Sequence, residues 1–374
     1  MANPSHFSPL RWEICLDFDS SALVGDPVAQ ATFTHEYIHY VQCLTGTVGR
    51  LILLDMVRVA VFAGLHKVHN GSIPARFQQI DLKQVFASAS RSDFDGTDPA
   101  LQYRELEREL TFAFAAESEV CNTHPPGTLF SKRLSVRGLE VDDFVHVTAY
   151  TPAGVVCVPV SDRVVFENMA RQVQRNFLLF AVGHSPIDDE RSKNHGDAPY
   201  ACLHDLIVSV LPSSEPYSKW TIAICQAALM CQHPGKAFEH IFGRLKLTRV
   251  HDLEGFVSAL NRDSWFEGEF NVPDVQTTVN DLVRGYGTAM RPGENYELAE
   301  LVRLVANAHN AIRSPWSYFA NPLVKWNDVA SWVRSFGCPP VRCNDRKILE
   351  LHGISTSLPF QSYLQAAHEL LGTP

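Results

Sequence analysis

The sequence predicts a mainly α-helical fold with a small β-sheet, which places the protein in the α+β class. Apolar residues recur at intervals of three and four along most of the 374 residues, as they do in amphipathic helices. From Ala198 onward this pattern is almost continuous, and Pro and Gly separate one helical segment from the next. The alternation that is typical of strands is confined to two short stretches, 11–18 and 144–160.

The first half of the chain combines a short strand at 11–18 with apolar helices. Asp26 can cap a helix, Pro27 fits its first position and Gly46 offers a stop, so we expect a helix at about 27–45. The elements expected next are a very apolar helix at 47–67, a loop at 88–98 and a helix at 99–120.

A β-hairpin marks the middle of the chain. Residues 144–160 read as two strands around a turn that contains Pro152. Ser161 or Asp162 can cap the helix that follows, at about 162–181. The remaining helices are expected at 199–211, 216–233, 234–246, 250–261, 274–290, 295–313, 325–336 and 358–371.

The composition excludes several classes of protein. Hydrophobic residues make up 45% and charged residues 20%, as in ordinary globular proteins, and the formal net charge is −9. Lys and Arg form no basic stripe, so we expect no nucleic-acid partner. No stretch approaches a membrane span, and residues 1–12 do not resemble a secretory signal. Nine dispersed cysteines fit a reducing cytoplasm, which is the expected location.

The most informative motif is H-E-x-x-H, formed by residues 35–39 inside the expected 27–45 helix. Residues four apart share one helical face, so the imidazoles of His35 and His39 can reach a single metal ion. Glu36 can hold a metal-activated water and take its proton. The His and Glu frequencies of this chain would produce about 0.04 such matches by chance. The motif therefore predicts a zinc site with Glu36 as the general base.

A catalytic zinc takes three protein ligands and keeps one position open. In one known arrangement the third is a His shortly after the motif, preceded by a Gly, but Gln42 and Thr45 stand at those positions. The first candidate is Glu167, because it lies in the expected 162–181 helix among apolar neighbours. An unpaired carboxylate is costly in such surroundings.

Two alternatives to Glu167 as a ligand stay open. Glu117 and Glu119, in the apolar end of the expected 99–120 helix, could supply the carboxylate instead. Glu167 could also be a surface residue that pairs with Arg171 four positions later.

The H-E-x-x-H helix together with a Glu on a later helix resembles the gluzincin class of zinc metallopeptidases. The resemblance covers the motif helix and the Glu167 helix. It implies a zincin-like core with Zn²⁺ bound by His35, His39 and Glu167 and with Glu36 as the base. It also implies a substrate-aligning strand beside the motif helix, for which 11–18 and 144–160 are the candidates.

Further site residues are expected around this core. A donor to the developing oxyanion is expected after the 162–181 helix, with Tyr200 first, His195 next, and His184 and Tyr217 behind them. Candidates to orient the histidines are Asp19, Asp55 and Asn168. The expected organisation is a catalytic region at 1–197 and a helical region at 198–374 that completes the cleft, or one continuous domain.

The function expected from the sequence is a zinc-dependent peptidase that hydrolyses a peptide bond in a protein or peptide substrate. The same ligands and base could serve a non-peptide amide, since metal-assisted hydrolysis works on any carbonyl. A binding or scaffold protein with a vestigial metal site is the alternative from another class. We expect neither a nucleic acid nor a membrane as partner.

Overall fold

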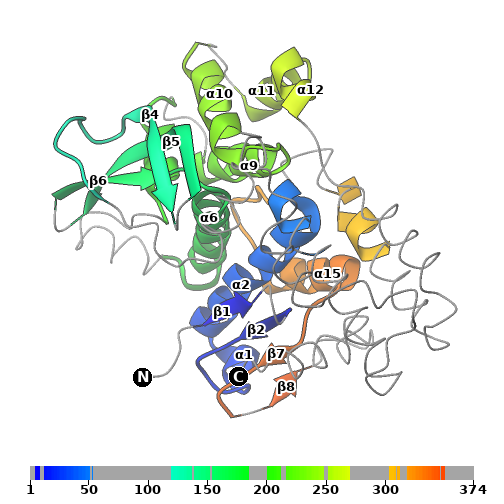
Figure 1. The fold of residues 1–374 in the computed structure, drawn as a ribbon. Helices are drawn as coiled ribbons and strands as arrows, with labels where there is room; N and C mark the ends of the chain where they lie inside the picture. Colours follow the sequence, from blue (N-terminus) through cyan, green and yellow to red (C-terminus); the bar gives the residue numbers. More distant parts are fainter. Residues whose placement is uncertain are drawn as a thin grey trace, which may run out of the picture.

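The protein is mainly helical, with two small β-sheets (Figure 1). This confirms the α+β class that the sequence predicts. The computed structural model describes residues 5–8, 12–50, 53, 119–136, 139–151, 154–184, 200–211, 216–247, 252–269, 303–308, 310–311, 318–345 and 347–349.

Most described helices begin and end close to the residues that the sequence predicts. They are α1 (Ala22–Gly25), α2 (Pro27–Thr45), α6 (Asp162–Val182), α8 (Cys202–Val208), α9 (Tyr217–Leu229), α10 (Pro234–Leu247), α11 (Leu253–Leu260), α12 (Ser264–Glu269) and α15 (Trp326–Phe336). The Asp26 side chain accepts a hydrogen bond from the Val28 amide at 2.8 Å, and Ser161 caps α6. Local capping therefore sets the starts of α2 and α6.

The first sheet joins segments that are far apart in the sequence. Its strands, in spatial order, are β1 (His6–Ser8), β2 (Glu13–Cys15), β7 (Val341–Arg342) and β8 (Ile348–Leu349). The β2 and β7 strands pair in parallel, with Ile14 opposite Val341. The sequence predicted almost only helix after Ala198, and this was wrong for β7 and β8, because two-residue strands are too short to show alternation.

The second sheet contains the predicted hairpin. Its strands, in spatial order, are β3 (Glu119–Val120), β6 (Gly154–Pro159), β5 (Leu139–Thr151) and β4 (Leu129–Val136). Glu119 therefore lies in a strand, and the prediction of a helix that continues to residue 120 was wrong at its end. Glu117, Asp55 and His195 lie outside the described residues, as do most of 47–67 and all of 88–98, 274–290 and 358–371.

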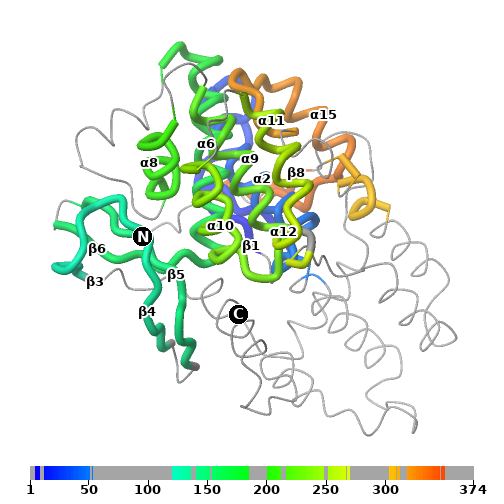
Figure 2. Tube along the Cα trace, turned by 90° about the horizontal axis from the view of Figure 1, so that it is seen from above, coloured from blue at the N-terminus to red at the C-terminus, as the bar shows by residue number. Residues whose placement is uncertain are grey.

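Three helices form the centre of the molecule. Helix α6 packs against α2 on one side and α9 on the other, and the three lie together in both views (Figures 1 and 2). Nearly every residue of α2 from Phe33 to Thr45 is buried, as expected for a helix enclosed on all sides. No described helix is long and apolar enough to cross a membrane.

Two tyrosines fix α2 to the end of α15. The Tyr37 hydroxyl donates to the carbonyl of Gly337 and the Tyr40 hydroxyl to the carbonyl of Phe336, both at 2.9 Å. These carbonyls belong to a helix terminus, where backbone acceptors lack partners within the helix. The two hydrogen bonds therefore satisfy α15 and hold one side of the motif helix in place.

Candidate metal centre

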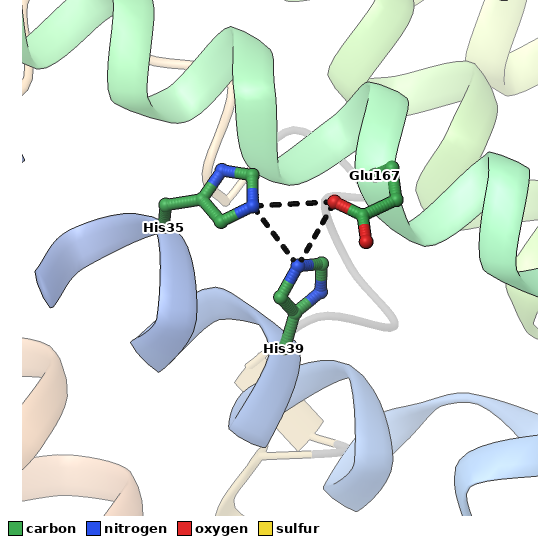
Figure 3. Close-up of side chains that lie close together, drawn as sticks. All are labelled: His35, His39 and Glu167. Carbon is green, nitrogen blue, oxygen red and sulfur yellow. Dashed lines mark hydrogen bonds and ion pairs between the residues drawn. The ribbon is translucent and has the colours of Figure 1, made fainter. Parts of the chain in front are cut away.

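The structure brings His35, His39 and Glu167 together between α2 and α6 (Figure 3). The two histidines lie one turn apart on α2, and Glu167 faces them from the second turn of α6. Glu167 Oε2 lies 3.2 Å from His35 Nε2 and 3.3 Å from His39 Nε2. The two Nε2 atoms are 3.1 Å apart. Among the described residues, no other group of three His, Cys, Asp or Glu converges in this way.

These separations fit a tetrahedral metal site. Zinc binds imidazole nitrogen and carboxylate oxygen at about 2.0–2.1 Å, so two ligands on a tetrahedron lie about 3.3 Å apart. The three observed separations, 3.1 to 3.3 Å, match this edge length closely. Two imidazoles and one carboxylate are also a donor set that catalytic zinc sites use. The residues present therefore fit a zinc ion.

The pKa values of His39 and Glu167 depend on their burial and on the charge of the neighbouring side chain. Burial alone lowers the pKa of His39, but Glu167 beside it outweighs this, and the pKa of His39 is raised. Burial likewise raises the pKa of Glu167, yet His39 and His35 hold it well below its usual range. His39 and Glu167 therefore each favour the charged form of the other, and a divalent cation would likewise favour the ionised carboxylate.

Gln42 contacts the ring nitrogen of His39 that does not face Glu167. Its Oε1 lies 2.9 Å from His39 Nδ1, and its Nε2 donates to the carbonyl of Phe166 at 3.1 Å. Because the amide nitrogen is committed to Phe166, the amide oxygen accepts the proton of Nδ1. His39 Nε2 then carries its lone pair toward the centre, which is the tautomer that a metal ligand needs.

Arg163 also forms an ion pair with Glu167, through the second oxygen of the carboxylate. Its Nη2 lies 3.3 Å from Glu167 Oε1, and Arg163 stands four residues earlier on α6. The alternative that Glu167 is a surface residue paired with Arg171 was wrong, since Glu167 is buried and Arg171 instead donates to Gln174. The guanidinium of Arg171 also lies 5.7 Å from the centre of the Tyr200 ring.

Glu36 is held by the backbone of β1. Its Oε2 accepts a hydrogen bond from the Phe7 amide at 2.7 Å, and the residue is buried. Among the described strands, β1 pairs only with β2, and the Phe7 amide points away from β2 toward Glu36. The predicted strand at 11–18 is therefore part of a sheet that touches the motif helix.

The other predicted site residues have different places. Asn168, a candidate to orient a histidine, instead accepts hydrogen bonds from the amides of Leu203 and His204 and so joins α6 to α8. His184 is exposed at the end of α6, and Tyr217 begins α9. Tyr200 precedes α8 and stays a prediction as an oxyanion donor.

Sequence reasoning missed Gln42, Arg163 and Phe7. Gln42 stands three residues after His39, and helical spacing alone could have placed its side chain beside the imidazole. Arg163 stands four residues before Glu167 and carries the same kind of signal. The Phe7 amide had no signal, because a backbone donor on a distant strand leaves no mark in the sequence.

The chain was also compared with known proteins. No protein family, no curated protein and no solved structure matches it. The residues of the centre and their geometry are therefore the observations that bear on function.

Proposed function

We propose that the protein is a zinc-dependent peptidase in which His35, His39 and Glu167 hold the metal. The convergence of their three ligand atoms between α2 and α6 is the observation that carries the proposal. When bound, zinc supplies a Lewis acid that polarises a carbonyl and lowers the pKa of water. The other parts of the reaction are assigned to residues of the chain.

Glu36 is the proposed general base. The Phe7 amide holds Oε2 and so restricts how the carboxylate can turn. Oε1 is the atom assigned to accept the proton of the attacking water and to pass it to the leaving amine. A base held in one orientation is more effective than a freely rotating one, because the geometry of proton transfer is set in advance.

The position of β1 beside Glu36 favours a peptide over other amides as substrate. An extended peptide can add to an exposed strand edge through main-chain hydrogen bonds. Strand β1 lies directly beside the proposed catalytic carboxylate, which its Phe7 amide binds, so a peptide aligned along β1 would run past this carboxylate. A small non-peptide amide would make no use of this arrangement.

Tyr200 is the proposed donor to the carbonyl oxygen as negative charge develops on it. Its ring lies against Arg171, which stands one helical turn after Glu167 on α6. A Tyr200→Phe variant should lose on the order of a hundredfold in kcat while it keeps its metal. An unchanged kcat would transfer the role to His195 or to none of these residues.

The decisive experiment combines metal content with hydrolysis. Wild-type protein should carry about one zinc per chain, and His35→Ala should lose it, because two remaining ligands hold zinc poorly. Glu36→Gln should keep the zinc and lose cleavage of a peptide library read by mass spectrometry. His124→Ala, which changes a histidine between β3 and β4, serves as the control and should behave as wild type.

Two results would count against the proposal. Wild-type protein that holds no metal, even after zinc is added, would end the idea of a zinc centre. A Glu36→Gln variant that cleaves the library as fast as wild type would exclude the assigned base.

A further inference from the structure

The two oxygens of the Glu167 carboxylate have different partners. Oε2 faces the histidines, at 3.2 Å from His35 Nε2 and 3.3 Å from His39 Nε2. Oε1 faces Arg163, whose Nη2 lies 3.3 Å away. The two oxygens therefore face different groups: Oε2 faces the proposed metal position and Oε1 faces Arg163.

This contact is more shielded from water than an ordinary surface ion pair. The side chain of Arg163 is 21% exposed and that of Glu167 only 9%, so water screens the pair incompletely. A guanidinium stays charged at any pH that the protein experiences, and its hydrogen bonds to a carboxylate are charge-assisted. The spacing of four residues places both side chains on one face of α6, which limits the ways in which Glu167 can turn.

We infer that Arg163 is a positioning residue that keeps Glu167 a monodentate ligand. This inference rests on the proposed zinc centre. A carboxylate with both oxygens available can bind a metal through both of them. Two imidazoles, two carboxylate oxygens and the water in the open position would then surround the ion, which would become five-coordinate instead of four-coordinate. Because Arg163 occupies Oε1, only Oε2 remains for the metal.

Cobalt substitution tests the inference without a substrate. Co²⁺ replaces Zn²⁺ in such sites, and its visible absorption reports geometry, since four-coordinate Co²⁺ absorbs much more strongly than five-coordinate Co²⁺. Full-length protein would be loaded with Co²⁺ alone as wild type, Arg163→Met and Arg171→Met. Methionine removes the charge and the donors but keeps an unbranched chain. Arg171 is the matched control, because it lies on the same helix and contacts Gln174 and Tyr200 rather than Glu167.

The expected result is a loss of visible absorption intensity in Arg163→Met, with Co²⁺ still bound, and an unchanged spectrum in Arg171→Met. Circular dichroism would check that both variants are folded, as the partial exposure of Arg163 leads us to expect. An Arg163→Met spectrum identical to wild type at full loading would overturn the inference and leave the zinc centre intact. Wild-type protein that binds no Co²⁺ would instead refute the centre itself.

Discussion

Replacing Gln42 with Leu tests whether a residue that is not itself a ligand helps to hold the metal centre in place. Gln42 is 1% exposed, and its amide joins His39 Nδ1 on α2 to the Phe166 carbonyl on α6. Leucine fills a similar volume but can neither accept from the imidazole nor donate to the carbonyl. The proton of His39 is then free to move to Nε2, where it blocks a metal ligand.

The size of the effect follows from the two groups that lose a partner. A buried polar group without a hydrogen bond costs about 1–3 kcal/mol. The Phe166 carbonyl falls at the low end, because it keeps its place in the hydrogen-bond ladder of α6. We therefore expect Gln42→Leu to lower the free energy of unfolding by about 2–4 kcal/mol. Zinc affinity should fall by about 10- to 100-fold, as is usual when a partner of a ligating histidine is removed.

The assay uses urea unfolding for stability and competition with a chromophoric chelator for zinc affinity. Gln30→Leu is the control, since Gln30 lies on the same helix but donates to the Leu23 carbonyl instead of contacting a histidine. It should leave zinc affinity unchanged. Gln42→Glu keeps an acceptor for His39 and should retain more affinity than Gln42→Leu. A Gln42→Leu variant that binds zinc as tightly as wild type would refute the reasoning.

Three further predictions concern other parts of the fold. Glu167→Ala should release zinc and Glu119→Ala should not, by elemental analysis; the reverse ranking would move the third ligand. Phe7→Pro should cleave peptides more slowly than Phe7→Ala, because only proline removes the amide that holds Glu36, and equal rates would dismiss that contact. Burial raises the pKa of Asp263, but the hydrogen bond from His240 outweighs this effect, and the pKa is lowered. The ionised carboxylate therefore stabilises the fold fully above about pH 4, and this stabilisation is lost below that pH. The difference in urea unfolding between wild type and Asp263→Asn should therefore shrink from pH 7 to pH 3, and a constant difference would contradict this.

The parts of the fold that the sequence could predict are those with local causes. Asp26 and Ser161 are typical capping residues, and α2 and α6 begin directly after them. Glu167 could be singled out because a carboxylate among apolar neighbours needs a partner. Each of these signals lies within a few residues of the feature that it predicts.

The parts that could not be predicted depend on contacts between distant segments. The hydrogen bond from Gln42 to Phe166 spans 124 residues, and that from Phe7 to Glu36 spans 29. Periodicity tells which face of an element is buried but does not tell which element covers it. The pairing of β2 with β7 is of the same kind, because neither strand is long enough to specify a register.

The attachment of the motif helix to residues 336–341 has a consequence for the order of events during synthesis. Tyr37, Tyr40 and β2 emerge from the ribosome early, but their partners Phe336, Gly337 and β7 follow about 300 residues later. At about 5–20 residues per second, the delay is about 15–60 s. Closing so large a loop is also slow, because its chain entropy must be lost before the contacts form. The nascent chain therefore carries both histidines long before it can hold their helix in its final place, so the proposed metal centre is completed late in translation.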